Sequence, residues 1–286
     1  MIKLSDVNYI YQEGMPFENH ALRDIDLEIP DGQVTAIIGH TGSGKSTLIQ
    51  LFNGLIRPTS GEISINGTVI TQKGVDMKKI RCMAGLVFQY PEHQIFEETV
   101  YRDIAFGPKN MGLSAEEIEK RVRSAMSAVG LDEKYADRSP FELSGGQKRR
   151  VAIAGVLAMN PEILILDEPT AGLDPRGRDA ILEIIKRLHS ENPEMIIVLV
   201  SHSMEDVAKI ADNVVVMNKG RIFMQGSVPY VFSKGEELVK IGLDIPQITQ
   251  LAFKLRHLGY PLDDDIYTVE AVAEKIKSLM EVKKNV

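Results

Sequence analysis

The sequence has one cysteine, no tryptophan and no long apolar run, and each absence narrows the possible classes of protein. The single cysteine, Cys82, cannot form an internal disulfide, and its apolar neighbours predict a small buried hydrophobic side chain rather than a reactive thiol. The longest apolar stretch, residues 195–200, is far shorter than the roughly 20 residues that span a bilayer. The first residues lack the basic and apolar regions of a signal peptide. We therefore expect a cytosolic chain that reaches a membrane only through a protein partner.

Length and charge narrow the classes further. The 286 residues are 44% hydrophobic and 26% charged, which excludes disordered and fibrous classes and predicts one large α/β domain with a small appendage. The formal net charge of −7 gives no chain-wide reason to bind nucleic acid or anionic lipid. No nucleic-acid partner is therefore expected.

Apolar periodicity predicts the order of strands and helices. The first thirty residues alternate apolar and polar positions, as half-buried antiparallel strands do. Residues 34–38, 163–166 and 195–200 are short continuous apolar runs, which are typical of strands buried on both faces. Amphipathic helical stretches such as residues 180–188 separate these runs. The alternation predicts a parallel sheet covered by helices.

The domain organisation follows from where the helical pattern dominates. Residues of about 91–159 are helical, most clearly at 115–129 and 147–158, and form a helical subdomain inserted into a domain of residues 1–240. Residues 241–286 contain two amphipathic helices, the second capped by Thr268, and form a small C-terminal domain.

A phosphate-binding loop lies between a predicted strand and a predicted helix. The segment Gly39-His-Thr-Gly-Ser-Gly-Lys-Ser-Thr47 has the G-x-x-x-x-G-K-[ST] pattern, in which glycines let backbone N–H groups turn toward phosphate oxygens. Lys45 supplies a point charge for the β- and γ-phosphates, and the Ser46 hydroxyl suits Mg²⁺. The predicted nucleotide contacts of this loop are Gly39, His40, Thr41, Gly42, Ser43, Gly44, Lys45, Ser46 and Thr47.

The sequence Leu143-Ser-Gly-Gly-Gln147 narrows the kind of NTPase, because at this point the chain resembles the ATP-binding-cassette (ABC) family, whose signature this is. Residues 163–168 resemble the family's Walker B strand and imply Asp167 as a Mg²⁺ ligand. The resemblance identifies Gln89 as the Q-loop glutamine, a further Mg²⁺ contact, and His202 as the switch histidine. It implies a P-loop NTPase fold with a parallel core sheet, an antiparallel β subdomain and an inserted helical subdomain.

The resemblance also implies a mechanism. Lys45, Gln89, Glu168 and His202 form the implied catalytic set, in which Glu168 polarises the attacking water and His202 contacts the γ-phosphate. The signature residues reach the nucleotide bound to an opposite subunit, so two ATPase chains, identical or paralogous, must face each other head to tail. The contacts implied at this shared site are Ser144, Gly145, Gly146, Gln147 and the D-loop residue Asp174.

The base of the nucleotide requires its own contact. We predict that Tyr11 stacks on adenine, and that Tyr9 lies on the opposite strand face in the core, although the two could exchange roles. The dipeptide Asn218-Lys219 starts like the guanine-reading N-K-x-D element, but Arg221 stands where the aspartate is required. The pattern therefore favours ATP.

Residues 88–96 and 103–110 are similar to the ATPase subunits of energy-coupling factor (ECF) transporters, which import vitamins and cobalt or nickel. The loop around Gly39–Thr47 looks most like the second of their two ATPase subunits. This resemblance implies a second ATPase, a transmembrane scaffold and, through the complex, a substrate-binding membrane S component. It places the chain at the cytoplasmic face of the cell membrane. The transported substrate is not encoded in the motor.

Two alternatives belong to other classes: a conventional ABC importer with a C-terminal regulatory domain, and a soluble cassette ATPase acting on ribosomes or DNA. Neither two cassettes nor a long coiled insertion is visible in the sequence, and two helices are too few to enclose a sensor ligand.

Two surfaces are predicted to bind partners. The acids Glu97 and Glu98 are expected to receive scaffold arginines, and the apolar neighbours of these acids are expected to exclude water. Those neighbours are Ile95, Phe96, Val100 and Tyr101. Apolar stripes of the tail are expected to pair the two ATPases. The stripes consist of Leu251, Leu255 and Leu258 with Val272, Ile276 and Leu279.

Overall fold

The computed structural model describes residues 1–263 and 266–284, without the side chains of residues 270 and 278–284. Strands β1 (Ile2–Tyr11), β2 (Asn19–Ile29), β4 (Ser60–Ile65) and β5 (Thr68–Val69) form an antiparallel sheet in the order β2-β1-β4-β5. Its inward positions are apolar and fully buried, as at Ile2, Val7 and Ile25. The half-buried antiparallel strands predicted for the first thirty residues are therefore present.

A six-stranded sheet in the order β10-β9-β3-β8-β7-β6 forms the centre of the molecule. The strands β3 (Val34–Gly39), β6 (Ala84–Val87), β7 (Ile163–Asp167), β8 (Ile196–Val200) and β9 (Asn213–Asn218) are parallel, and β10 (Arg221–Ser227) is an antiparallel edge strand. Every residue of β3, β7 and β8 is buried. The predicted parallel sheet is confirmed, and its carboxyl edge brings together loops that are distant in sequence.

Helices α1 (Lys45–Phe52), α2 (Met77–Met83), α6 (Pro175–Glu191) and α7 (Met204–Ile210) connect the strands. Cys82 lies in α2 and is half-buried, so the prediction of a buried cysteine was wrong. The buried residue of this helix is Ile80, and a residue two positions along a helix points to another side.

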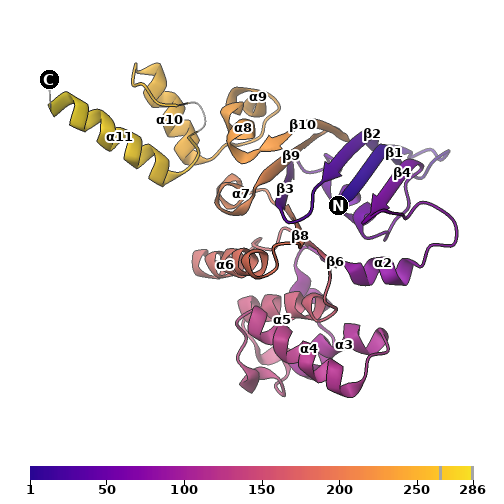
Figure 1. Ribbon diagram of the computed structural model, residues 1–286. Helices are drawn as coiled ribbons and strands as arrows, with labels where there is room; N and C mark the ends of the chain where they lie inside the picture. Colours follow the sequence, from indigo (N-terminus) through magenta and orange to yellow (C-terminus); the bar gives the residue numbers. More distant parts are fainter. Residues whose placement is uncertain (264–265, 285–286) are drawn as a thin grey trace.

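A helical group is inserted between β6 and β7, and Figure 1 shows it at the bottom of the molecule, below the sheets. It contains η1 (Pro91–Gln94), α3 (Val100–Asn110), α4 (Ala115–Ala128), η2 (Glu133–Tyr135), η3 (Pro140–Glu142) and α5 (Gly145–Leu157). Side chains of Thr99, Ser114 and Ser144 cap the three α-helices by accepting backbone N–H bonds. The predicted helices at 115–129 and 147–158 are thus present.

The chain after β10 continues through α8 (Val228–Ser233) and α9 (Gly235–Lys240) to α10 (Gln247–His257) and α11 (Val269–Lys284). Figure 1 shows α8 and α9 near β9 and β10, whereas α10 and α11 extend away from the sheets. The predicted Thr268 cap is present, because its Oγ1 accepts a bond of 3.3 Å from the backbone N–H of Ala271. The boundary at residue 240 remains a proposal, since Leu243 and Ile245 still pack in the same apolar cluster as β3.

The tail buries part of its apolar stripes within itself. Val272 is 3% exposed, in a small cluster against which Leu255 also packs, so these two residues do not form the expected outer surface. Leu251, Leu258 and Ile276 are exposed, as predicted, and the side chain of Leu279 lies outside the described residues. Among residues 1–263 and 266–284, no helix is long and apolar enough to cross a membrane.

Candidate active site

A cavity of about 740 Å³ opens at the carboxyl edge of the six-stranded sheet. Predicted site residues that line it are Tyr11, Thr41, Gly42, Gly44, Lys45, Ser46, Thr47, Gln89, Glu168 and His202. The lining also includes residues that the sequence did not single out for the site: Asn19, His20, Ala21, Arg23, Lys219 and Gly220. The other nine predicted residues, all within the described part of the chain, lie outside this lining; they are Gly39, His40, Ser43, Ser144, Gly145, Gly146, Gln147, Asp167 and Asp174.

The phosphate-binding loop has the backbone that its glycines permit. Gly44 caps α1 with φ 103, and a Cβ there would come within 2.6 Å of the Ala21 carbonyl oxygen. Lys45 is 5% exposed, and its Nζ donates to the carbonyl oxygens of Gly39 at 2.7 Å and His40 at 2.9 Å. Burial lowers the pKa of Lys45, and the Glu168 and Asp167 carboxylates oppose that shift. The two hydrogen bonds therefore hold the Lys45 ammonium group against the backbone of the phosphate-binding loop.

Two acids follow strand β7. Asp167 is its last residue and accepts a 3.4 Å hydrogen bond on Oδ2 from the Ser46 hydroxyl. Burial, and then the neighbouring Glu168 carboxylate, raise the pKa of Asp167 to about 6. Glu168 has a left-handed backbone, with φ 48, and its N–H donates to the Val200 carbonyl at 3.0 Å. A left-handed glutamate is uncommon and is typical of a functional site.

The Glu168 carboxylate is fixed from two sides. The Gln89 amide Nε2 donates to Glu168 Oε2 at 2.7 Å, and His202 Nε2 lies 2.9 Å from Glu168 Oε1. Each oxygen thus has a partner from a different loop. The arrangement holds one carboxylate at the mouth of the phosphate-binding loop.

Tyr11 lies at the rim of the cavity, 39% exposed, with its hydroxyl 3.2 Å from the Thr47 hydroxyl. Tyr9 is half-buried against the core, and burial raises its pKa. The two ring centroids are 4.7 Å apart in an edge contact, so the prediction that they occupy opposite strand faces was wrong. Residues two apart on a strand share a face, which the bulge at Tyr9 and Ile10 does not reverse here.

The signature residues and Asp174 sit at helix starts. Ser144 Oγ accepts from the backbone N–H of Gln147 at 3.3 Å, and Gln147 Oε1 accepts from the backbone N–H of Ser144 at 2.9 Å. Asp174 Oδ1 accepts from the backbone N–H of Gly177 at 2.6 Å. Ser144, Gly145 and Asp174 are exposed. Within one chain, these residues are presented outward rather than into the cavity.

Sequence reasoning missed Arg149, which is 1% exposed. Its guanidinium donates to Glu92 at 2.7 and 3.0 Å and to the carbonyls of Pro169 and Ala171 at 3.0 and 2.6 Å. Burial alone would raise the pKa of Glu92, but the hydrogen bond and charge of Arg149 lower it overall. This arginine joins the signature helix to the segment after Glu168. No periodic signal marks it, because it stands within the charged run Lys148 to Arg150.

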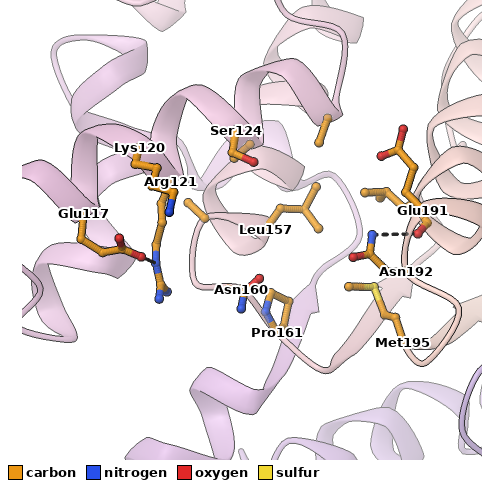
Figure 2. Close-up of a pocket in the computed structure, with 14 residues that line it drawn as sticks. Glu117, Lys120, Arg121, Ser124, Leu157, Asn160, Pro161, Glu191, Asn192 and Met195 are labelled. Atoms are coloured by element: carbon orange, nitrogen blue, oxygen red, sulfur yellow. Dashed lines mark hydrogen bonds and ion pairs between the residues drawn. The ribbon is translucent and has the colours of Figure 1, made fainter.

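A second cleft, of about 410 Å³, lies between α4, the turn at Asn160 and Pro161, and the end of α6 (Figure 2). Its Arg121 donates to Glu117 Oε1 at 2.7 Å and to the Met159 carbonyl at 3.2 Å. The chain's own groups therefore engage its guanidinium. This cleft contains none of the predicted site residues, and we assign the chemistry to the larger cavity.

Comparisons with known proteins show the family to which the chain belongs. The family model described as "ABC transporter" matches residues 22–171. The Energy-coupling factor transporter ATP-binding protein EcfA2 of Caldanaerobacter subterraneus subsp. tengcongensis is 57% identical over 285 residues, covering 100% of this chain and 99% of that protein. The EcfA2 of Clostridium perfringens is 56% identical over 285 residues, covering 99% of each.

Solved structures share the fold. The structure of cbiO1 from Clostridium perfringens, described as part of the ABC transporter complex cbiONQ, has a TM-score of 0.74 at 43% identity and covers 87% of this chain and 97% of its own. The dimeric ATP-binding cassette MJ0796 in a post-hydrolysis state with ADP and Pi has a TM-score of 0.71 at 30% identity, covering 79% and 98%.

Fold and cavity together define an ATP-binding cassette ATPase. The chain belongs to the ABC transporter family and, within it, to the energy-coupling factor transporter ATP-binding proteins. It is an ATPase subunit of a transporter of this type, which confirms the fold, the enzyme class and the function predicted from the sequence.

Proposed function

We propose that this chain, paired with a second ATPase at the cytoplasmic face of the cell membrane, binds and hydrolyses Mg²⁺-ATP to drive the import of a vitamin or transition-metal ion. The observation that carries the proposal is the Glu168 carboxylate, held by Gln89 and His202 at the mouth of the cavity that contains Lys45.

The cavity has the groups that ATP requires. The N–H groups at the start of α1 and the Lys45 ammonium suit the phosphates, and the exposed ring of Tyr11 suits adenine. Arg23 and Lys219 add positive charge to the same lining. A nucleotide with several negative charges is therefore favoured over a neutral ligand.

The residues present also fit a Mg²⁺ ion. Ser46 and Asp167 present hard oxygens 3.4 Å apart, and the Gln89 side chain reaches the same region, where it bonds Glu168. Among the described residues, no group of three His, Cys, Asp or Glu side chains could hold a metal alone. This agrees with an ion that shares its coordination with phosphate oxygens. Bound there, Mg²⁺ would neutralise negative charge on the phosphates.

Glu168 is the proposed general base. Its carboxylate is positioned rather than mobile, because each oxygen has a partner. A fixed acceptor beside the phosphates orients water for attack, and such positioning accounts for much of the catalysis of phosphoryl transfer. His202 contacts the Glu168 carboxylate and lines the cavity. It is the proposed contact of the γ-phosphate.

A second ATPase is proposed because the signature residues of one chain do not line that chain's own nucleotide cavity. Ser144 and Gly145 are exposed and lie outside the lining of their own cavity. A head-to-tail dimer would bring them to a partner's nucleotide. The solved cassette MJ0796, described as dimeric with ADP and Pi, supports the pairing of two such chains.

The scaffold is proposed to dock beside Gln89, but the structure changes the expected residues. Ile95 and Val100 are buried in the core of the helical group, so they are not contact residues, and Tyr101 is half-buried and packs against the same core. Phe96 and Phe106 are 60% and 44% exposed, with ring centroids 4.9 Å apart. The Glu98 carboxylate pairs with Arg102, and Glu97 is half-buried. An aromatic pair bordered by acids is the proposed docking surface.

Co-purification tests the proposal. Isolated from membranes, the tagged full-length chain should carry a multi-span scaffold protein and a second, similar ATPase, and the complex should hydrolyse ATP. Recovery with ribosomes, or of the chain alone from intact membranes, would contradict it. Lys45→Ala should still assemble with the scaffold and the second ATPase but should lose ATP binding. This variant therefore separates ATP binding from assembly.

A further inference from the structure

His40 belongs to the phosphate-binding loop, yet its side chain points away from the nucleotide cavity. In the described structure it is absent from the lining, which includes its neighbours Thr41 and Gly42. Its ring Nε2 instead donates a hydrogen bond to the backbone carbonyl of Ile241, 201 residues further along the chain. The side chain therefore joins the loop to the C-terminal segment.

The acceptor lies where helix α9 ends. The backbone N–H of Gly242 bonds the Val239 carbonyl at 2.8 Å, and that of Leu243 bonds the Leu238 carbonyl at 2.9 Å, so the chain turns sharply after Ile241. Carbonyls at a helix end lack partners within the helix and carry partial negative charge. An imidazole N–H is a suitable donor to such a group.

Gly242 leaves space for the histidine ring. A Cβ on this residue would lie 3.2 Å from His40 Cε1 and 3.4 Å from Nε2, and the backbone has φ 77. A side chain would therefore crowd the ring as well as strain the turn.

The same two segments also share an apolar cluster. Leu238, Leu243 and Ile245 are buried together with Ala36 and Ile38 of β3, the strand that leads into the loop. The hydrogen bond thus crosses an interface that is already packed. Movement of the loop would be transmitted to α9 rather than absorbed by a gap.

The backbone of His40, unlike its side chain, contacts a residue that lines the nucleotide cavity. Its carbonyl oxygen accepts the 2.9 Å bond from Lys45 Nζ, so one residue contacts the proposed phosphate-binding lysine and the C-terminal segment. The C-terminal segment has a second polar contact, in which the backbone N–H of Gln247 donates to Glu205 Oε1 of α7 at 3.3 Å. Glu205 and His202 line the same hollow as Asp244 at the start of the tail.

We infer that His40 is a positioning residue that fixes the phosphate-binding loop against the end of α9, so that ATP binding and the placement of the C-terminal segment are thermodynamically linked. The inference rests on the proposed ATP site. Linkage is reciprocal: if the bond to Ile241 stabilises the loop that binds ATP, bound ATP must stabilise the α9 turn equally.

The test uses the full-length chain and four proteins: wild type, His40→Ala, His40→Gln and His257→Ala. Gln offers an amide N–H near the position of the histidine Nε2. His257 is an exposed histidine of α10 whose ring Nδ1 donates a hydrogen bond to the Phe253 carbonyl of the same helix. ATP affinity is measured by calorimetry, and amide hydrogen exchange is measured at residues 238–245 with and without Mg²⁺-ATP.

His40→Ala should weaken ATP binding about two- to tenfold, the effect of losing one ordinary hydrogen bond. It should also speed exchange at Gly242 and Leu243 and abolish the slowing that ATP causes there in the wild type. His40→Gln should restore both, and His257→Ala should match the wild type, whereas a general folding defect would not be rescued by Gln.

Equal ATP affinity and equal exchange in wild type and His40→Ala would overturn the inference while leaving the ATP site intact. Loss of affinity without any change of exchange at residues 238–245 would also overturn it. A wild type that binds no ATP would defeat the proposed function, and the link with it.

Discussion

His202 and Glu168 are joined by a 2.9 Å contact between Nε2 and Oε1, although they lie 34 positions apart in the sequence, just after the ends of β8 and β7. The two strands are adjacent and parallel, so their carboxyl ends meet at one edge. Gln89 binds the other oxygen of the same carboxylate. Residues that follow three neighbouring strands thus meet at one carboxylate.

Glu168→Gln should slow ATP hydrolysis by about 10²–10⁴-fold, because an amide cannot act as a general base, while ATP binding persists. Turnover of the reconstituted ATPase pair checks this, with nucleotide affinity measured in parallel. Glu183→Gln, which changes an exposed glutamate of α6, is the matched control. Near-normal turnover in a preparation free of contaminating ATPases would remove Glu168 from the mechanism.

Arg149→Met should destabilise the chain by about 3–5 kcal/mol, because Glu92 is left without its buried partner and two carbonyls lose their donor. Urea unfolding monitored by circular dichroism measures the change. The control is Arg123→Met, which removes exposed ion pairs and should cost only about 0–1 kcal/mol. Equal losses of unfolding free energy in both variants would show that the buried pair stabilises the chain no more than the exposed pairs do.

The raised pKa of Asp167 predicts a pH dependence. Its carboxyl has a pKa of about 6 in the fold against 3.8 ordinarily, so the folded state binds more protons between these values. The contribution of Asp167 to the free energy of unfolding should therefore fall as pH rises from about 4 to about 6, by an amount on the order of 2 kcal/mol. Asp167→Asn should remove this slope, and Asp179→Asn, an exposed control, should keep it. The measurement is made without nucleotide or Mg²⁺.

The fold could be predicted where local pattern and burial coincide. The continuous apolar runs of β3, β7 and β8 are buried throughout, and the glycine pattern of the phosphate-binding loop specifies its backbone. Side-chain orientation was less predictable. Ile95 and Val100 resemble surface residues in an acidic segment, but the helical group folds over them, and only the packing of α3 decides this.

Long-range polar contacts outside the family motifs could not be predicted. Arg149 and Glu92 are 57 residues apart, and His40 and Ile241 are 201 apart, so neither spacing repeats with the period of a helix or strand. Such contacts exist because the sheet brings distant loops together. The sequence shows which groups are chemically able to bind, whereas the topology decides which of them meet.

The tail should pair the ATPases through its exposed apolar residues. Leu251→Glu with Leu258→Glu places charges on side chains that are 43% and 74% exposed, so the chain itself should still fold. Light scattering should then show a weaker nucleotide-free ATPase pair, because apolar contact area is replaced by charge. Glu237→Gln on α9 is the control. Unchanged association would mean that these leucines are ordinary surface residues.

The last prediction concerns the docking surface beside Gln89. Glu97→Lys with Glu98→Lys reverses the charge next to Phe96, where arginines of a membrane scaffold would find acids and an exposed ring. We expect scaffold binding and transport by the reconstituted complex to fall by about tenfold or more, because like charges now face each other. ATP hydrolysis by the isolated ATPases should change little.

A control separates docking from local folding. Glu98 already pairs with Arg102, so Glu98→Lys alone also removes a local ion pair at the start of α3, and Arg102→Gln removes that pair while keeping the acid. If docking depends on acidic charge, Arg102→Gln should assemble and transport normally while the double variant does not. Normal assembly and transport by the double variant would show that these acids do not hold the scaffold, leaving the aromatic pair Phe96 and Phe106 to be tested in their place.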